Sequence, residues 1–351
     1  MVAPESAGAQ ISAGPAGYAV VTRGMASPYS TGPWGGRRSG GHAGFVGRTR
    51  HLRIGSYASR PNPAGSSPAG TGSGAIAARC RTDGNRTLRL LAIVAHPDDE
   101  SLGLGGLLAR SAAEDVETFV MTATRGQRGR FYDRASPGEE EVGRVREVEL
   151  RAAARELGVS GVRVLDYMDG EVDSADPAAV GEIAAEIRRI RPDVVVTFGA
   201  DGAYGHPDHI AISQLTGAAI ALAGSCGRAG SPDSPPVHQV EKLYWIAWGG
   251  ATWARYEAAV KRLVSKVDGV ARQANPWPDW AITTSVDATA HWRTVWRAVQ
   301  CHATQIHAYG RLAELTEAEH RAIWGTQEFY RVFSLVNGGR ERETDVFEGL
   351  R

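Results

Sequence analysis

The chain has 351 residues, and at about 100 to 200 residues per domain this length allows one to three domains with a core of useful size. Hydrophobic residues make up 42% and charged residues 22%, which is ordinary for a globular protein. Lys plus Arg and Asp plus Glu each number 39, so no nucleic-acid partner that depends on bulk positive charge is expected. No apolar stretch reaches about 18 residues, and no membrane span is predicted.

The cysteine content is low and odd. Cys80, Cys226 and Cys301 lie far apart in the chain. This count excludes a disulfide scaffold and a four-cysteine zinc site. It fits a reducing compartment, and we expect a cytoplasmic protein.

The first part of the chain differs from the rest. Residues 1–80 contain eight arginines, one acid (Glu5) and 16 of the 43 glycines. Such a composition buries too little apolar surface to offset the entropy of ordering. We predict a disordered Gly/Ser/Pro/Arg-rich extension over 1–85, a folded domain over 86–340 and a tail over 341–351. The start has no basic segment followed by an apolar run, so no export signal is predicted.

Strands and helices alternate after the extension. Apolar runs predict buried strands, and these lie at 90–95, 116–121, 162–165 and 194–198. Helices are expected between and after them, at 102–113, 140–157, 177–190 and 208–222. Beyond 225 we expect strands at 242–248 and 328–335 and a helix at 288–302. The predicted fold class is α/β: a Rossmann-like, mostly parallel sheet with helices on both faces and a C-terminal cap.

Two polar segments follow strands of this predicted sheet. Ala-His-Pro-Asp-Asp-Glu (95–100) follows the first strand, and Tyr-Gly-His-Pro-Asp-His (204–209) follows the strand that ends at Phe198. In open α/β sheets, ligands bind outside the carboxyl ends of the strands, so both segments are expected at the same rim. Together they hold three imidazoles and four carboxylates, a density that predicts a divalent cation. Imidazole and carboxylate suit zinc, with iron or cobalt also allowed by ligand type.

The two segments together resemble the LmbE-like (PIG-L) N-acetylglucosaminyl deacetylase family. The resemblance covers about 88–335 and implies a zinc-dependent enzyme. Weaker similarities lie at 146–150, 169–170, 286–287 and 302–305. The family often has Gly-Glu-x-Gly after the second strand, whereas this chain has Gly-Gln-Arg-Gly at 126–129. That difference removes a negative charge near the rim and bears on substrate details rather than on the metal ligands.

The resemblance also implies roles for single residues. The metal ligands fall on His96, Asp99 and His209, holding one Zn²⁺ per chain with Fe²⁺ as the alternative. The general base falls on Asp98. His206 falls on the residue that polarises the developing oxyanion or protonates the leaving amine.

Three further positions match the family less closely. Tyr204 matches a mobile tyrosine that supports the oxyanion in some members. Arg146 and Asp169 match positions that contact substrate.

Elementary chemistry supports these expectations. Zinc lowers the pKa of bound water from 15.7 to about 7 and polarises a carbonyl. Asp98 can take the proton of that water. A donor aimed at the oxyanion is worth about 2.7 to 4 kcal/mol, and His206, protonated beside Asp208 or another acid, would serve. Either His206 or protonated Asp98 can then give the amine its proton, and the sequence does not separate these two routes.

Neighbouring polar residues have simpler interpretations. Asp208 and Glu100 are expected as acids in the first turns of helices. His302 and Gln305 are expected to hold structure near the site. The sequence contains no HExxH, no GxSxG and no phosphate-binding GxxxxGK[ST] motif, so the main competing hydrolase and nucleotide-binding signatures have no support.

Three functions follow, with a small-molecule amide or amino sugar as partner and no preferred oligomeric state. The first is a zinc-dependent hydrolase that removes an N-acetyl (N-acyl) group from an N-acetylglucosamine-like sugar or glycoconjugate. The second is a zinc amidase that cleaves a larger amide, such as a thiol conjugate or an acylated natural product. Its mark would be a wider rim after Gln127 and between Ala223 and Pro236. The third is a non-catalytic sugar- or metal-binding module.

Overall fold

The structure is a computed structural model that describes residues 86–225, 236–259, 264–267, 269–273 and 275–351. The extension that the sequence predicts to be disordered, 1–85, lies outside the described residues. Most of the segment between Ala223 and Pro236 does so too.

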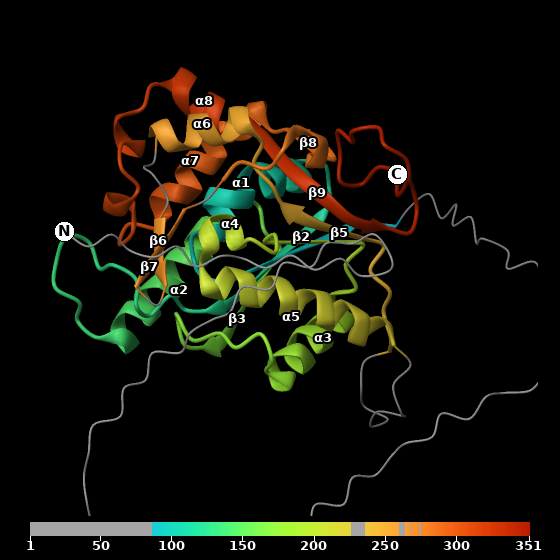
Figure 1. Ribbon diagram of the computed structural model, residues 1–351, viewed down its shortest axis with the longest axis horizontal. Helices are drawn as coiled ribbons and strands as arrows, with labels where there is room; N and C mark the ends of the chain where they lie inside the picture. The colour runs from blue at the N-terminus through green and yellow to red at the C-terminus, as the bar shows by residue number, and fades with distance from the viewer. Residues whose placement is uncertain (1–85, 226–235, 260–263, 268, 274) are drawn as a thin grey trace, which may run out of the picture. The chain divides into compact units, whose positions relative to one another are not determined.

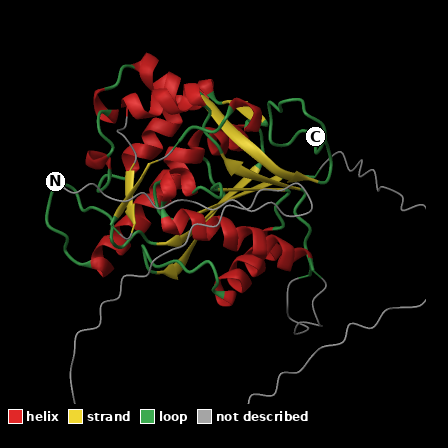
Figure 2. Ribbon diagram, viewed as in Figure 1, coloured by secondary structure: helices red, strands yellow, loops and turns green. Residues whose placement is uncertain are grey.

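A seven-stranded sheet forms the centre of the described domain (Figures 1 and 2). Five strands are parallel: β1 (Arg89–Val94), β2 (Glu117–Thr124), β3 (Gly161–Tyr167), β4 (Val194–Thr197) and β5 (Lys242–Ile246). β9 (Thr326–Ser334) and β8 (Thr284–Asp287) complete one edge in antiparallel orientation. The strand order is β3-β2-β1-β4-β5-β9-β8. The predicted α/β class with a mostly parallel sheet is confirmed.

The strand order places a ligand site beside β1. The chain runs outward from β1 through β2 to β3, and then returns to the other side of β1 with β4. Such a reversal opens a crevice at the carboxyl ends of the two central strands. Both motifs follow these two strands, because the first begins after β1 and the second follows β4.

Helices cover both faces of the sheet. They are α1 (Asp99–Ala113), α2 (Glu139–Glu156), α3 (Pro177–Ile190), α4 (Gly202–Gly205), α5 (Pro207–Gly224), α6 (Gly250–Ala259), α7 (Trp292–Cys301) and α8 (Glu317–Trp324). Figure 1 shows α3 and α5 together on one side, and α1 with α7 on the other. The strands between them are buried on both faces, which is why β1 is apolar from Leu90 to Val94 and β4 from Val194 to Val196.

The cap contains more elements than the sequence predicts. A short hairpin, β6 (Val264–Val267) with β7 (Val270–Gln273), precedes β8. Short 3₁₀ helices are added at η1 (Asp279–Ala281), η2 (Thr289–His291), η3 (Ile306–Ala308) and η4 (Leu312–Glu314). The helix expected over 288–302 is divided into η2 and α7. A second apolar cluster, which includes Trp292, Val295 and Trp324, holds α6, α7 and α8 together.

The last residues, which the sequence predicts as a tail over 341–351, pack into the domain. Val346 and Phe347 are fully buried. Glu343 is 2% exposed and receives hydrogen bonds from Lys242 Nζ and Tyr244 Oη, both at 2.6 Å. This segment therefore stabilises β5. Among the helices that the structure describes, none is long and apolar enough to cross a membrane.

Candidate metal and active site

The loop after β1 is fixed by its own carboxylates. Oδ2 of Asp99 accepts hydrogen bonds from the backbone N–H of His96 at 2.8 Å and of Ala95 at 3.2 Å. Asp98 has a φ of 104°, in the left-handed region that side chains other than Asn and Asp rarely adopt. Backbone strain of this kind persists where the surroundings enforce it, and it is common at functional sites.

The structure brings together the three residues expected to bind the metal. The carboxylate of Asp99 lies between two imidazoles: Oδ2 is 3.6 Å from Nδ1 of His96, and Oδ1 is 3.5 Å from Nε2 of His209. The two imidazole rings lie 5.3 Å apart, although the residues are 113 positions apart in the sequence. All three side chains are largely buried. We call His96, Asp99 and His209 the candidate ligand cluster.

His209 carries the clearest sign of a cation site. Its side chain is 2% exposed and stacks on Phe198 with the ring centroids 3.8 Å apart. Neither ring nitrogen makes a hydrogen bond within the described part of the chain. Burial lowers the pKa of His209 to about 3, so the imidazole is neutral. A buried neutral imidazole with unpaired nitrogens fits a metal ligand, because such polar atoms otherwise find hydrogen bonds.

Two further carboxylates lie behind His96. Its Nε2 is 3.0 Å from Oδ2 of Asp208 and 3.2 Å from Oδ1 of Asp169. Burial opposes protonation, but the hydrogen bonds to the surrounding carboxylates outweigh it and raise the pKa of His96 well above its usual value. The carboxylates fix the ring with Nδ1 toward the ligand cluster. Carboxylates in this position orient a ligating imidazole and make it more basic.

These contacts differ from the expected ones. Asp208 does lie in the first turn of α5, but its carboxylate is fully buried on His96 and also accepts from the backbone N–H of Gly170 at 2.6 Å. Asp169 was expected to contact substrate, yet it is 9% exposed and faces His96. Hydrogen bonding to His96, against the effect of burial, lowers the pKa of Asp169 to about 2.

Asp98 is held from two sides. Its Oδ2 accepts a hydrogen bond of 2.5 Å from the hydroxyl of Tyr309 and one of 3.0 Å from Nη2 of Arg146. Burial raises the pKa of the Asp98 carboxyl, and the nearby Arg146 opposes this shift. Tyr309 carries no recognisable motif, and sequence reasoning missed it.

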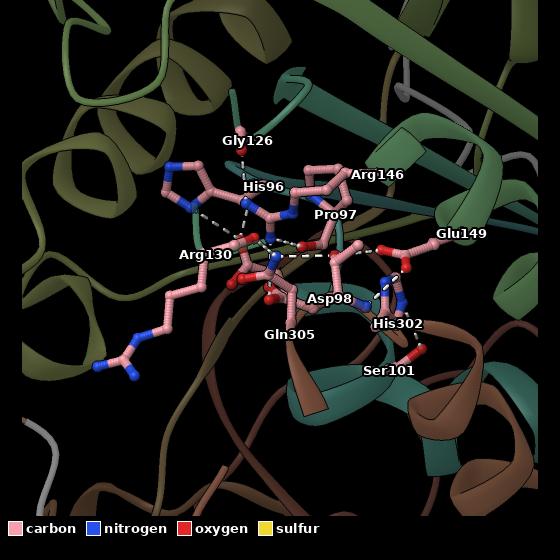
Figure 3. A network of polar contacts seen from close by, with 12 residues as sticks. His96, Pro97, Asp98, Ser101, Gly126, Arg130, Arg146, Glu149, His302 and Gln305 are labelled. Atoms are coloured by element: carbon pink, nitrogen blue, oxygen red, sulfur yellow. Dashed lines mark hydrogen bonds and ion pairs between the residues drawn. The ribbon is translucent and has the colours of Figure 1, made fainter. Parts of the chain in front are cut away.

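Arg146 lies beneath the site rather than in it. Its side chain is 4% exposed, and the guanidinium also donates to the carbonyl oxygens of Gly126 at 2.8 Å and Pro97 at 2.6 Å (Figure 3). These donors are directed at the protein, and the expected contact between Arg146 and substrate stays a prediction. The side chain of Arg146 lies on the buried face of α2 and extends inward to the loop after β1.

Arg146 explains why glycine stands at both ends of the Gly-Gln-Arg-Gly segment (126–129), which differs from the pattern frequent in the family. A Cβ atom at Gly126 would lie 2.0 Å from Nη1 of Arg146, and one at Gly129 would lie 2.3 Å from it. Gln127 is 8% exposed and donates to the backbone oxygen of Tyr167 at 3.1 Å. The segment thus wraps the buried guanidinium.

His206 precedes α5 and caps it. Its Nδ1 accepts a hydrogen bond of 3.2 Å from the backbone N–H of Asp208. Burial lowers the pKa of His206, which leaves a neutral ring with its hydrogen on Nε2. Asp208, one of the acids expected beside His206, instead binds His96 with its carboxylate.

His206 also lies close enough to share a cation. One ring nitrogen from each of His96, His206 and His209 lies within 4.8 Å of the other two, so His206 is an alternative third ligand to Asp99. We favour Asp99, because each of its oxygens faces a different imidazole and because Nδ1 of His206 already accepts a backbone hydrogen bond.

A cavity of about 180 Å³ opens beside the cluster. Tyr204 lines it, with its ring 5.2 Å from that of His209. The preceding residue, Ala203, has a φ of 63° and a ψ of −58°, a second strained backbone position at the site. The cavity is lined by Asp98, Asp99, Leu102, Gly103, Phe198, Ala203, Tyr204, His209, Trp248, Tyr256, Ala308 and Tyr309.

Glu100 is a buried part of the site. It was expected as a first-turn acid, and it begins α1 beside Asp99, but its side chain is fully buried. Oε1 lies 2.7 Å from Nε2 of His302 and accepts from Ser101 at 2.6 Å, while Oε2 accepts from the backbone N–H of Asp98. His302 therefore supports the loop of Asp98 through Glu100.

The segment that follows α7 is held in the same way. Glu149 of α2 accepts hydrogen bonds from both the backbone N–H and the hydroxyl of Thr304, at 2.7 Å each. Gln305 donates to the backbone oxygen of Arg130 at 2.5 Å (Figure 3). These contacts place the chain that carries Tyr309 over the cavity.

The cluster of buried imidazoles and carboxylates, with a cavity beside it at the carboxyl edge of a Rossmann-like sheet, defines a candidate metal-binding enzyme site. The family described as GlcNAc-PI de-N-acetylase (PIG-L) matches residues 91–220. A 1D-myo-inositol 2-acetamido-2-deoxy-alpha-D-glucopyranoside deacetylase from Rhodococcus jostii is 35% identical over 294 residues, covering 75% of this chain and 98% of the relative. The chain belongs to the PIG-L family.

Two solved structures share the fold. GalB, the 4-carboxy-2-hydroxymuconate hydratase from Pseudomonas putida, is 21% identical with a TM-score of 0.55, over 72% of this chain and 99% of its own. The N,N'-diacetylchitobiose deacetylase from Pyrococcus horikoshii is 19% identical with a TM-score of 0.50, over 70% and 83%. One fold thus serves a hydratase and a deacetylase, so the function has to be argued from the site.

Proposed function

We propose that this protein is a zinc-dependent N-deacetylase that removes the acetyl group from an N-acetylglucosamine-like sugar or glycoconjugate, giving acetate and a primary amine. One observation carries the proposal: the carboxylate of Asp99 lies between two buried imidazoles, and the carboxylate of Asp98 lies beside it on the cavity. The deacetylase relatives with 1D-myo-inositol-linked substrates support an N-acetylglucosaminide as the substrate.

The residues of the candidate ligand cluster would hold the metal. Nδ1 of His96, the carboxylate of Asp99 and Nε2 of His209 form a set of two imidazoles and one carboxylate, which suits zinc and also allows Fe²⁺. When bound, the ion acidifies water and polarises an amide carbonyl. Asp169 and Asp208 would keep His96 oriented for this task.

Asp98 is assigned as the general base. Tyr309 and Arg146 both bind its Oδ2, which leaves Oδ1 to take a proton from the attacking water. Burial raises the pKa of Asp98, and a base whose pKa is nearer to neutral is the more effective one. General-base catalysis of this kind contributes about 10²- to 10⁴-fold to the rate.

The tautomer of His206 separates its two possible roles. Because Nδ1 accepts a backbone hydrogen bond, the neutral ring can donate from Nε2 to a developing oxyanion. Giving that proton away would leave an imidazolate, which is strongly unfavourable. We therefore assign the protonation of the leaving amine to Asp98, after it has taken the proton of water. Tyr204 would support the oxyanion from the cavity side.

The catalytic unit that we propose starts at about 86 and includes the C-terminal segment. Val346 and Phe347 are part of its core, so the expected boundary at 340 moves to the end of the chain. The cytoplasmic location stays a prediction.

The test combines metal analysis with release of primary amine from N-acetylglucosaminides. We expect about one zinc per chain, and we expect Asp98→Asn to lose at least about 10²-fold in kcat while it keeps the metal. Asp166→Asn, at an exposed aspartate of β3, is the matched control and should keep its activity. An unchanged rate in Asp98→Asn contradicts the base assignment, and the absence of both metal and turnover contradicts the proposed function.

A further inference from the structure

We propose that the cavity beside the candidate ligand cluster is an acyl pocket that accepts chains longer than acetyl. This inference rests on the proposed function, because it concerns the acyl half of the amide that the site would cleave. It extends the proposed substrates from N-acetyl sugars to N-acyl amino sugars whose acyl group carries several methylenes.

The charged and imidazole groups of the cavity lining are Asp98, Asp99 and His209, beside which the amide carbon would react. The remaining walls are apolar or aromatic and come from α1, the segments after β4 and β5, α6 and the η3 segment. They include Leu102, Phe198, Trp248, Tyr256 and Ala308.

These walls suit an alkyl chain better than a sugar. A hexose brings several hydroxyl groups, and each one costs free energy when it is buried without a partner. Among the other lining residues, polar side-chain atoms are the hydroxyls of Tyr204 and Tyr256 and the indole nitrogen of Trp248, while the hydroxyl of Tyr309 is bound to Asp98. A methylene needs no partner and gains from burial against such walls.

The volume of the cavity also favours an acyl chain longer than acetyl. Its volume of about 180 Å³ is several times the ~30 Å³ that one water molecule occupies, and the methyl group of an acetyl is of similar size to a water. An acetyl group would therefore fill only part of this cavity, which leaves room beside its apolar walls for a longer occupant.

The sugar would lie outside the cavity. His206 and Asp169 contact His96 but do not line the cavity, so its apolar walls lie on one side of the cluster. An amide at the cluster can thus direct its acyl chain into the cavity and its sugar away from these walls.

The first experiment measures amine release from glucosamine acylated with acetyl, propionyl, butyryl and hexanoyl groups. We expect kcat/KM to rise with chain length by up to about fourfold per buried methylene, the equivalent of about 0.8 kcal/mol. Ala308→Phe, which fills the cavity, should lower the hexanoyl-to-acetyl ratio of kcat/KM at least tenfold. Ala313→Phe, at an exposed alanine of the same cap segment, is the matched control and should leave the ratio unchanged.

A binding measurement supplies a readout that does not depend on turnover. Hexanoate should raise the melting temperature of the protein more than acetate at the same concentration, and Ala308→Phe should abolish the difference. If acetylglucosamine is cleaved while each longer chain slows the reaction, and hexanoate stabilises no more than acetate, the acyl pocket is overturned and the deacetylase proposal stands. If no substrate releases amine, the deacetylase proposal fails, and the melting temperatures alone decide the pocket.

Discussion

The hydroxyl of Tyr309 donates a hydrogen bond of 2.5 Å to Oδ2 of Asp98, although the two residues are 211 positions apart in the chain. Nη2 of Arg146 reaches the same oxygen at 3.0 Å. A carboxylate with one oxygen held in this way can present only the other to a reacting water. The cap therefore takes part in setting the geometry of the base on the sheet.

Replacing Tyr309 with Phe should slow catalysis more than it weakens binding. The Asp98 carboxylate would lose one of two donors and rotate, and small misplacements of a reacting group cost up to about 10²-fold in rate. We expect kcat to fall by about ten- to a hundredfold, with a small change in KM and unchanged metal content. Tyr167→Phe removes a hydroxyl that donates to the exposed Glu182 and serves as the control. A rise in KM with unchanged kcat would show that Tyr309 contacts substrate instead.

Replacing Arg146 with Met should destabilise the whole domain. The change leaves Asp98 as a buried charge without its partner and frees the carbonyl oxygens of Gly126 and Pro97. Breaking a buried pair from one side costs about 3–5 kcal/mol. We expect a loss of that order in the free energy of unfolding, measured by urea denaturation.

Arg144→Met provides the comparison for this loss. Arg144 is exposed on the same helix and, within the described residues, pairs with Glu141 alone, so its removal should cost no more than about 0.5 kcal/mol. Equal losses in the two variants would mean that the buried contacts of Arg146 contribute no more than a surface ion pair.

Removing the metal should stop the reaction without unfolding the chain. A chelator should abolish amine release, and added zinc should restore it. His209→Ala should retain far less metal, because it deletes one of the three proposed ligands. His238→Ala removes another buried histidine, one that bonds to the backbone oxygen of Pro192, and should retain its metal. Metal content that is normal in His209→Ala would contradict the ligand assignment.

Glu343 should make stability depend on pH in the acid range. Burial acts against its ionisation, but hydrogen bonds from Lys242 and Tyr244 outweigh it and lower the pKa of Glu343 to about 2. A carboxyl group whose pKa is lowered by folding stabilises the folded state at pH values above its ordinary pKa, here 4.5. This contribution is lost as the pH falls from 4.5 to 2. Glu343→Gln should thus be less stable by about 3 kcal/mol at pH 7, with the difference shrinking over that range.

Unfolding curves at several pH values test this expectation. Glu341→Gln changes an exposed acid two positions away and should follow the parent protein throughout. A difference between Glu343→Gln and the parent that is constant from pH 7 to pH 2 would show that the ionisation of Glu343 does not stabilise the fold.

The sheet and the two motifs could be predicted because their signals are local. An unbroken apolar run such as 90–95 is typical of a strand buried on both faces, and a polar segment directly after it lies at the carboxyl edge of the sheet. The cap gave a weaker signal, since 3₁₀ helices and aromatic loops have no hydrophobic period. Its side chains reach the site only through contacts between distant parts of the chain.

The roles of Glu100 and Asp208 could not be predicted from the sequence for the same reason. Both are acids in the first turns of helices, where an exposed and a buried side chain give the same sequence pattern. Their partners, His302 and His96, lie 202 and 112 positions away. For Arg146 a signal did exist: it is four residues from Val142 and from Leu150, so the spacing alone places it on the buried face of α2.

The guanidinium of Arg146 occupies the space that side chains at Gly126 and Gly129 would need. Neither glycine can therefore gain a side chain while the arginine keeps its place. A relative that carries a larger residue at either glycine should also carry a shorter one in place of the arginine, and it must then hold its catalytic aspartate by other means. Covariation of these positions across the family would trace how often that exchange has occurred.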